Sequence, residues 1–172
     1  HSKNEHAVHS PFVFSLLTKC FYDKKSKPEY AILKKYRNSL LANNNTIEVT
    51  DFGAGSKVFK SNTREISKIA KTAGISPKRA KLLFRVVNYF QPEAILEIGT
   101  SLGLATSALA LGNPKAVVTT LEGCPETANQ CQLQLQKFNI NYQVYSFVLF
   151  PIYRKNLASY FFSSFPKRPA SC

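Results

Sequence analysis

The sequence predicts an α/β fold, with a Rossmann-like parallel sheet of two to three recognisable strands behind a helical amino-terminal region. From residue 94 onward, short apolar runs typical of strands alternate with helical patterns. The strand-like runs are 94–98 and 116–121, and helical spacing occupies 102–111 and 125–138. Because strands joined by a helix pair in parallel through a right-handed crossover, this alternation indicates a parallel sheet.

The first 92 residues predict mainly helices. Apolar residues recur at helical spacing in four segments bounded by proline, glycine or asparagine, namely 10–21, 28–42, 62–73 and 77–90. A short strand is expected at 46–50. We therefore divide the chain into a helical, basic region (1–92), a partial Rossmann-like core (93–142) and an atypical tail (143–172).

The tail differs in composition from the rest of the chain. It contains eight aromatic residues and no acid, and three prolines interrupt any long element. A third strand is expected near 144–150, while the further strands of a complete sheet are missing. Because the chain contains no methionine, we expect a fragment or a trimmed chain. The loss of acids and the missing strands suggest a frameshifted or miscalled tail, which would leave a truncated, inactive product.

The overall composition is that of a globular protein. The chain has 172 residues and 44% hydrophobic content, and its apolar runs are far shorter than the roughly 18 residues of a membrane-spanning helix. Without a signal pattern or a CxxC pair, it is expected to be cytoplasmic, with reduced thiols and no membrane partner. Residues 1–90 hold 17 basic and six acidic residues of a chain with net charge +13. Their scatter favours solvated faces over a nucleic-acid surface.

Two spaced glycines and two acids predict a ligand site at the carboxyl ends of the strands. Gly99 lets the chain turn sharply, and Gly103 lets the next helix begin close to a ligand, where exposed N–H groups attract acceptors. Glu122 follows 19 residues after Gly103, at the end of the second strand, where a carboxylate can accept both hydroxyls of a ribose. Glu97 either holds the loop or receives an ammonium group. The pattern indicates a nucleoside-binding βαβ unit.

The residue between the two glycines bears on the kind of nucleoside ligand. A dinucleotide site prefers a third glycine that admits a pyrophosphate, and this chain has Ser101 at the middle position. The pattern therefore favours a ligand without phosphates over NAD.

With these motifs, residues 82–138 resemble a class I S-adenosylmethionine-dependent methyltransferase, nearest the small-molecule O-methyltransferases of the catechol and caffeoyl-CoA type. The matching text is LEIGTSLG at 96–103 and LEGCP at 121–125. The resemblance implies S-adenosylmethionine as cofactor and methyl transfer to an oxygen or nitrogen of a small-molecule acceptor. The family's seven-stranded sheet is matched only in part.

The resemblance also implies which residues bind the cofactor. The glycines and their neighbours would line its methionine part, Glu122 would bind its ribose, and Gly123 and Cys124 would lie beside the adenine. The residues carried over are Glu97, Gly99, Thr100, Ser101, Gly103, Glu122, Gly123 and Cys124. Where the family often has a hydroxyl, this chain has Ala105 with Thr106 next to it. No catalytic base is assigned.

No metal site is expected. Metal-dependent members of the family use aspartates after the fourth strand, whereas this chain has only Asp23 and Asp51, both upstream. His6 and His9 lack a further ligand candidate nearby and are expected to be disordered or capping residues.

Two segments of the amino-terminal region offer rival interpretations. Residues 66–83 resemble a DNA-binding helix-turn-helix with glycine in the turn and a basic second helix. The second helix continues through apolar residues toward the strand at 94, which favours packing over DNA binding. Residues 51–55 (DFGAG) are similar to a methyltransferase glycine loop but lack a partner acid, so a plain turn is favoured over a second wall of the site.

Overall fold

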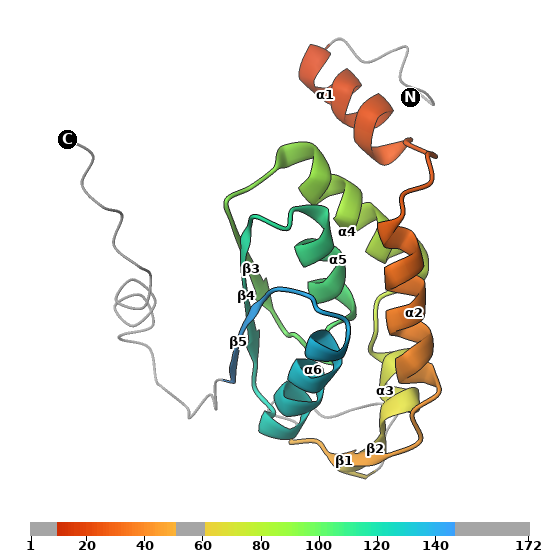
Figure 1. Cartoon of the computed structure of the whole chain (residues 1–172), viewed down its shortest axis with the longest axis vertical. Helices are drawn as coiled ribbons and strands as arrows, with labels where there is room; N and C mark the ends of the chain where they lie inside the picture. Colours follow the sequence, from red (N-terminus) through yellow and green to blue (C-terminus); the bar gives the residue numbers. More distant parts are fainter. Residues whose placement is uncertain (1–9, 51–60, 147–172) are drawn as a thin grey trace, which may run out of the picture.

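The computed structural model describes residues 10–50 and 61–146 (Figure 1). The helices are α1 (Pro11–Leu16), α2 (Glu29–Leu41), α3 (Ile66–Thr72), α4 (Pro77–Phe90), α5 (Leu104–Gly112) and α6 (Pro125–Lys137), and α1 continues into a π-helical segment, η2 (Leu17–Phe21). The strands are β1 (Thr46–Glu48), β2 (Thr63–Glu65), β3 (Ala94–Ile98), β4 (Val117–Glu122) and β5 (Gln143–Ser146). The glycine loop at 51–55, His6, His9 and the tail beyond 146 lie outside the described residues.

The main sheet is parallel and has the order β3-β4-β5. Helix α5 connects β3 to β4 and α6 connects β4 to β5, so the α/β fold class and the parallel pairing are confirmed. The third strand expected near 144 is present as β5. The register places Glu97 opposite Thr120 and Ile98 opposite Leu121, which aligns the carboxyl ends of β3 and β4.

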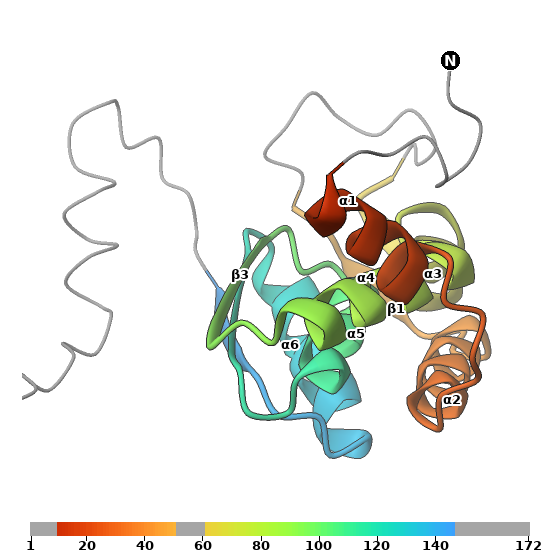
Figure 2. The same ribbon diagram turned by 90° about the horizontal axis from the view of Figure 1, so that it is seen from above.

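The helices that follow and precede the strands all lie on one side of this sheet (Figures 1 and 2). Helices α5 and α6 form the layer next to the strands, and α2 and α3 lie beyond them. On the other face of the sheet, among the described residues, Leu96, Ile98 and Val117 are 46%, 81% and 49% exposed. Of the two faces of the sheet, only the one that the helices cover contributes to the described core.

The amino-terminal helices share that core with the sheet layer. Tyr36 and Leu40 of α2 pack with Leu102, Cys131 and Leu135, all nearly or fully buried. A smaller cluster joins α2, α4 and α5 through Leu33, Ala80, Phe84 and Ala108. Burial of these side chains stabilises the placement of α2 directly behind the loop that follows β3.

Three details differ from the sequence-based expectations. Residues 63–65 form β2, not the start of a helix, because they pair with β1 in a short antiparallel ladder. Helix α5 begins at Leu104, two residues later than expected, because Gly103 has a left-handed φ of 74° that helical backbone does not allow. Helix α1 forms as expected, but none of its residues is buried.

No described helix has both the length and the apolar character needed to cross a membrane.

Candidate functional site

The loop between β3 and α5, residues 99–103, is hereafter the glycine turn. It has positive φ at Gly99 (92°), Ser101 (49°) and Gly103 (74°). The backbone N–H groups of Gly99 and Thr100 both donate to the carbonyl of Leu121, at 2.9 and 3.1 Å, and so attach the turn to the end of β4. Ser101 holds a left-handed conformation that is uncommon for residues other than glycine, so the surrounding bonds must fix it there.

The two glycines of the turn are required for different reasons. A Cβ atom built on Gly103 would lie 2.5 Å from the Tyr36 hydroxyl oxygen and 2.7 Å from Cys131 Sγ, so the backbone there packs against α2 and α6. A Cβ built on Gly99 would meet no atom of residues 10–50 and 61–146 within 4 Å. One side of the turn is thus packed against the core, whereas no other part of the described chain packs against Gly99 on its Cβ side.

Glu122 connects the glycine turn to the loop after β4. One carboxylate oxygen accepts the N–H of Ser101 at 2.7 Å, and the other accepts the N–H of Cys124 at 3.0 Å. Bonds from N–H groups to an ionised carboxylate are short and strong. Because each carboxylate oxygen has two lone pairs, both keep capacity for a further donor.

Glu97 lies in β3, two residues before the glycine turn, on the face of the strand that the helices cover. One of its oxygens accepts the hydroxyls of Thr106 at 2.5 Å and Thr120 at 2.7 Å, and the Thr120 hydroxyl lies 2.6 Å from that of Thr100. Burial raises the pKa of Glu97 above its ordinary value, although the two threonine hydroxyls lower it. These bonds hold the turn, α5 and β4 together.

Tyr36 and Cys131 support the turn from behind. The Tyr36 hydroxyl donates to the carbonyl of Leu102 at 2.9 Å, and its ring is fully buried. Burial raises the pKa of both groups, that of Cys131 to about 12. Both are therefore neutral at physiological pH, and their role is to pack and position the turn.

Sequence reasoning missed Tyr36 and Thr120 as parts of this site. Tyr36 lies within the helical segment expected at 28–42, and nothing local in the sequence connects it with Leu102, 66 residues away. Thr120 could have been found from the sequence. It lies two residues before Glu122, and Glu97 lies two residues before Gly99. When the carboxyl ends of the two strands are aligned, Glu97 and Thr120 therefore lie on the same face of the sheet.

The structure brings all eight predicted residues to the carboxyl edge of the sheet, but Cys124 is turned away from the turn. Its side chain is 2% exposed, and its sulfur accepts the N–H of Thr50 at 3.4 Å and contacts the carbonyl oxygen of Glu48 at 3.6 Å. Only its backbone N–H points to Glu122. Cys20, Cys124 and Cys131 are each free and buried.

The segment that resembles a helix-turn-helix forms α3 and α4. Ala80, Phe84 and Val87 of α4 are buried, and the smaller apolar cluster joins this helix to α5. The second helix therefore packs into the domain along the face expected from its apolar residues. In the described part of the chain no three histidine, cysteine, aspartate or glutamate residues lie close enough to hold a metal ion.

No protein-family model matches the chain, and no curated protein matches it. Among solved structures it is similar to an SAH-bound methyltransferase of Podospora anserina (14% identity, 81% of this chain and 50% of that one, TM-score 0.48). It is also similar to an O-methyltransferase of Bacillus cereus in complex with SAH (19%, 73% and 46%, TM-score 0.43). A third is the O-methyltransferase TomG of Streptomyces achromogenes in complex with SAM (18%, 77% and 47%, TM-score 0.40).

The chain spans about half the length of these solved proteins. Because the identities are low and the superpositions partial, the candidate function rests on the chain's own residues.

Proposed function

We propose that the chain carries the S-adenosylmethionine site of a methyltransferase that transfers a methyl group to an oxygen or nitrogen of a small-molecule acceptor. The observation that carries the proposal is the bond between Glu122 and the Ser101 N–H, beside a Gly99 whose Cβ position no atom of the described residues approaches within 4 Å. This arrangement combines a diol acceptor, a fixed backbone turn and a glycine that no described neighbour covers, all at one edge of the sheet. Ligands of open parallel sheets bind at this edge.

The residues present fit such a cofactor. A ligand lying on the turn would occupy the space that a Cβ at Gly99 would otherwise fill. The free lone pairs of Glu122 would accept the two ribose hydroxyls, each bond contributing about 1.5–3 kcal/mol. Thr100 would contribute backbone, because its buried hydroxyl already contacts Thr120.

The charge at the edge also suits this cofactor. The chain has net charge +13 and only ten acids, yet Glu97 and Glu122 both lie at the turn. S-Adenosylmethionine supplies an electrophilic methyl group on a positively charged sulfonium when bound. Two carboxylates in a basic chain favour a cation at this place over an anion.

Glu97 is proposed to hold the turn, with a cofactor contact as a lesser contribution. Both of its hydrogen bonds go to threonines of α5 and β4. Fixing the turn before the ligand arrives reduces the entropy lost on binding and keeps methyl and acceptor in line.

Calorimetric titration with S-adenosylhomocysteine tests the proposal. The folded chain is expected to bind in the micromolar range, and Glu122→Gln is expected to weaken binding at least tenfold, which corresponds to about 1.4 kcal/mol. The matched control is Glu93→Gln, which removes the same charge from an exposed residue just before β3, at the opposite edge of the sheet. Its affinity should stay within twofold.

Two outcomes would overturn the proposal. One is a folded wild-type chain, with native circular dichroism, that shows no heat of binding at millimolar ligand. The other is an equal loss of affinity in Glu122→Gln and Glu93→Gln, because that would indicate a general charge effect.

A further inference from the structure

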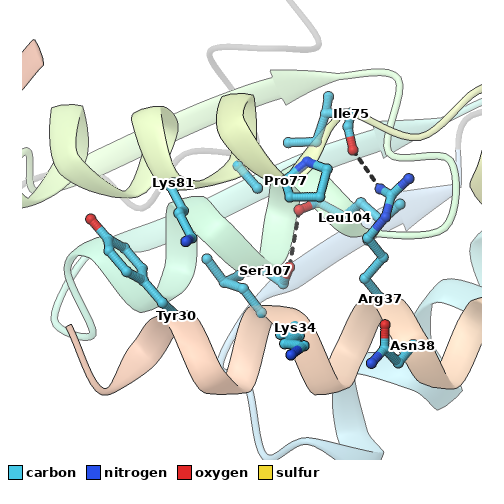
Figure 3. A pocket seen from close by; sticks show the side chains of 11 residues that line it. Tyr30, Lys34, Arg37, Asn38, Ile75, Pro77, Lys81, Leu104 and Ser107 are labelled. Carbon is cyan, nitrogen blue, oxygen red and sulfur yellow. Dashed lines mark hydrogen bonds between the residues drawn. The ribbon is translucent and has the colours of Figure 1, made fainter. Parts of the chain in front are cut away.

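A concave region lies where α2, α4 and α5 meet, hereafter the helix pocket (Figure 3). Its volume is about 310 Å³. The apolar part of its lining consists of Leu33, Ile75, Pro77, Ala80 and Leu104. This is enough space for the body of a small organic molecule of one or two rings.

Three cations surround this apolar surface. Lys34 and Arg37 come from α2, and Lys81 comes from α4 on the facing side (Figure 3). None of the eleven lining residues is acidic. Within residues 10–50 and 61–146 none of the three cations has an ion pair, and Arg37 makes one hydrogen bond, to the carbonyl of Ile75 at 2.6 Å.

A second hollow, next to the helix pocket, adds further positive charge to this surface. Tyr30 and Lys81 line both. The second hollow adds four basic side chains and one acid, namely Lys24, Lys25, Lys78, Arg85 and Asp23. Asp23 already faces Lys27 at 3.7 Å. The Tyr30 hydroxyl is buried and has no hydrogen-bond partner in the described part of the chain.

These features together select a ligand class. Inorganic phosphate would satisfy the cations but leave the apolar lining in contact with water, and a neutral apolar molecule would leave the cations unpaired. We propose that the helix pocket binds an amphiphilic organic anion, with its apolar body against Leu33, Ala80 and Leu104 and its phosphate or carboxylate head between Lys34 and Lys81. The site is separate from the glycine turn, and the proposal does not depend on methyl transfer.

The probe for the test is 1-naphthyl phosphate, which has a two-ring body and one anionic head, and its neutral counterpart is 1-naphthalenemethanol. Calorimetric titration of the full chain with the phosphate is expected to give a dissociation constant on the order of 0.1 mM. The neutral alcohol is expected to bind at least tenfold more weakly, because it offers Lys34 and Lys81 no anionic group.

A pair of matched variants separates the helix pocket from the overall charge. Lys34→Glu/Lys81→Glu changes two exposed residues of the pocket, whereas Lys35→Glu/Arg79→Glu makes the same charge change at exposed neighbours on the same helices that do not line it. We expect at least a tenfold loss of 1-naphthyl phosphate affinity in the first double variant and less than threefold in the second.

Three results would overturn the proposal. Equal weakening in both double variants would indicate attraction to the overall positive charge, as expected for a surface that meets a polyanion such as duplex DNA. Equal affinity for the phosphate and the alcohol would indicate a purely apolar cavity. No binding of 1-naphthyl phosphate by a chain with native circular dichroism would indicate that the helix pocket holds no such ligand.

Discussion

The glycine turn and the helix pocket differ in how their polar groups are paired. At the turn, the carboxylates of Glu97 and Glu122 both accept hydrogen bonds from groups on neighbouring elements. In the helix pocket, Lys34 and Lys81 have no ion-pair partner in the described part of the chain. The turn is thus part of what holds the fold together, whereas the pocket's charges contribute little to it. The glycine turn carries negative charge and the helix pocket positive charge, so the turn would attract cationic ligands and the pocket anionic ones.

The largest effect is expected from the packed side of the turn. Gly103→Ala should lower the free energy of unfolding by about 3–5 kcal/mol, because the added methyl would overlap Tyr36 and Cys131 and strain a left-handed backbone. Gly99→Ala strains the backbone alone and should cost about 1–2 kcal/mol. Urea denaturation followed by circular dichroism measures both.

The two alanine variants control each other, since each adds one methyl to a glycine with positive φ. Equal destabilisation by the two would contradict the contrast between a packed and an open side of the turn. A Gly103→Ala variant too unstable to purify, beside a stable Gly99→Ala, would agree with the contrast.

A smaller effect is expected where α2 supports the turn. Tyr36→Phe removes one hydroxyl and leaves the Leu102 carbonyl without its buried donor, which should cost about 1–3 kcal/mol. The matched control is Tyr30→Phe, whose buried hydroxyl has no partner in the described part of the chain, so that its loss should leave the free energy of unfolding unchanged or raise it. Urea denaturation of both variants makes the comparison, and equal costs would show that Tyr36 does not hold the turn.

The turn could be predicted from the sequence because its signals are local, whereas its supports and the helix pocket could not. The strand at 94–98 and the acid after the second strand follow from residues close together in the chain. Tyr36 reaches Leu102 only because α2 packs behind the turn. The same holds for the helix pocket. The basic residues are scattered along the chain, which indicated solvated faces. Lys34 and Lys81 converge only because α2 and α4 face each other.

The short strand β2 was missed for a related physical reason. Residues 63–65 are Thr-Arg-Glu, which carry no apolar alternation, and they are extended only because β1 pairs with them. A three-residue strand is stabilised by its partner more than by its own propensity. Local patterns therefore predicted the parallel core and not this ladder.

A further prediction concerns the pH dependence of the turn. Because the pKa of Glu97 is raised in the folded state, the folded chain binds more protons than the unfolded chain between the ordinary glutamate pKa, about 4.3, and the raised value. Its contribution to stability is therefore present at low pH and is lost as pH rises through that window. Each unit by which the folded pKa of Glu97 exceeds the unfolded pKa corresponds to about 1.4 kcal/mol in the free energy of unfolding.

The test compares wild type with Glu97→Gln, which cannot titrate at this position. Thermal unfolding is followed between pH 4 and pH 8, and the difference in stability between the two chains should shift in favour of Glu97→Gln as pH rises through the window. A difference that stays constant with pH would show that Glu97 has its ordinary pKa in the folded chain.

The smallest changes in stability are expected from substitutions in the helix pocket, and they test whether its charges contribute to the fold as those of the glycine turn do. Lys34→Ala should change the free energy of unfolding by less than about 0.5 kcal/mol, because the side chain is exposed and has no ion pair in the described part of the chain. Lys81→Ala should cost about 0.5–1 kcal/mol, because its ammonium lies 4.9 Å from the centre of the Tyr30 ring. Urea denaturation that gave losses as large as that of Tyr36→Phe would assign these cations a structural role. Losses this small would confirm that the cations of the helix pocket, unlike the groups around the glycine turn, contribute little to the stability of the fold.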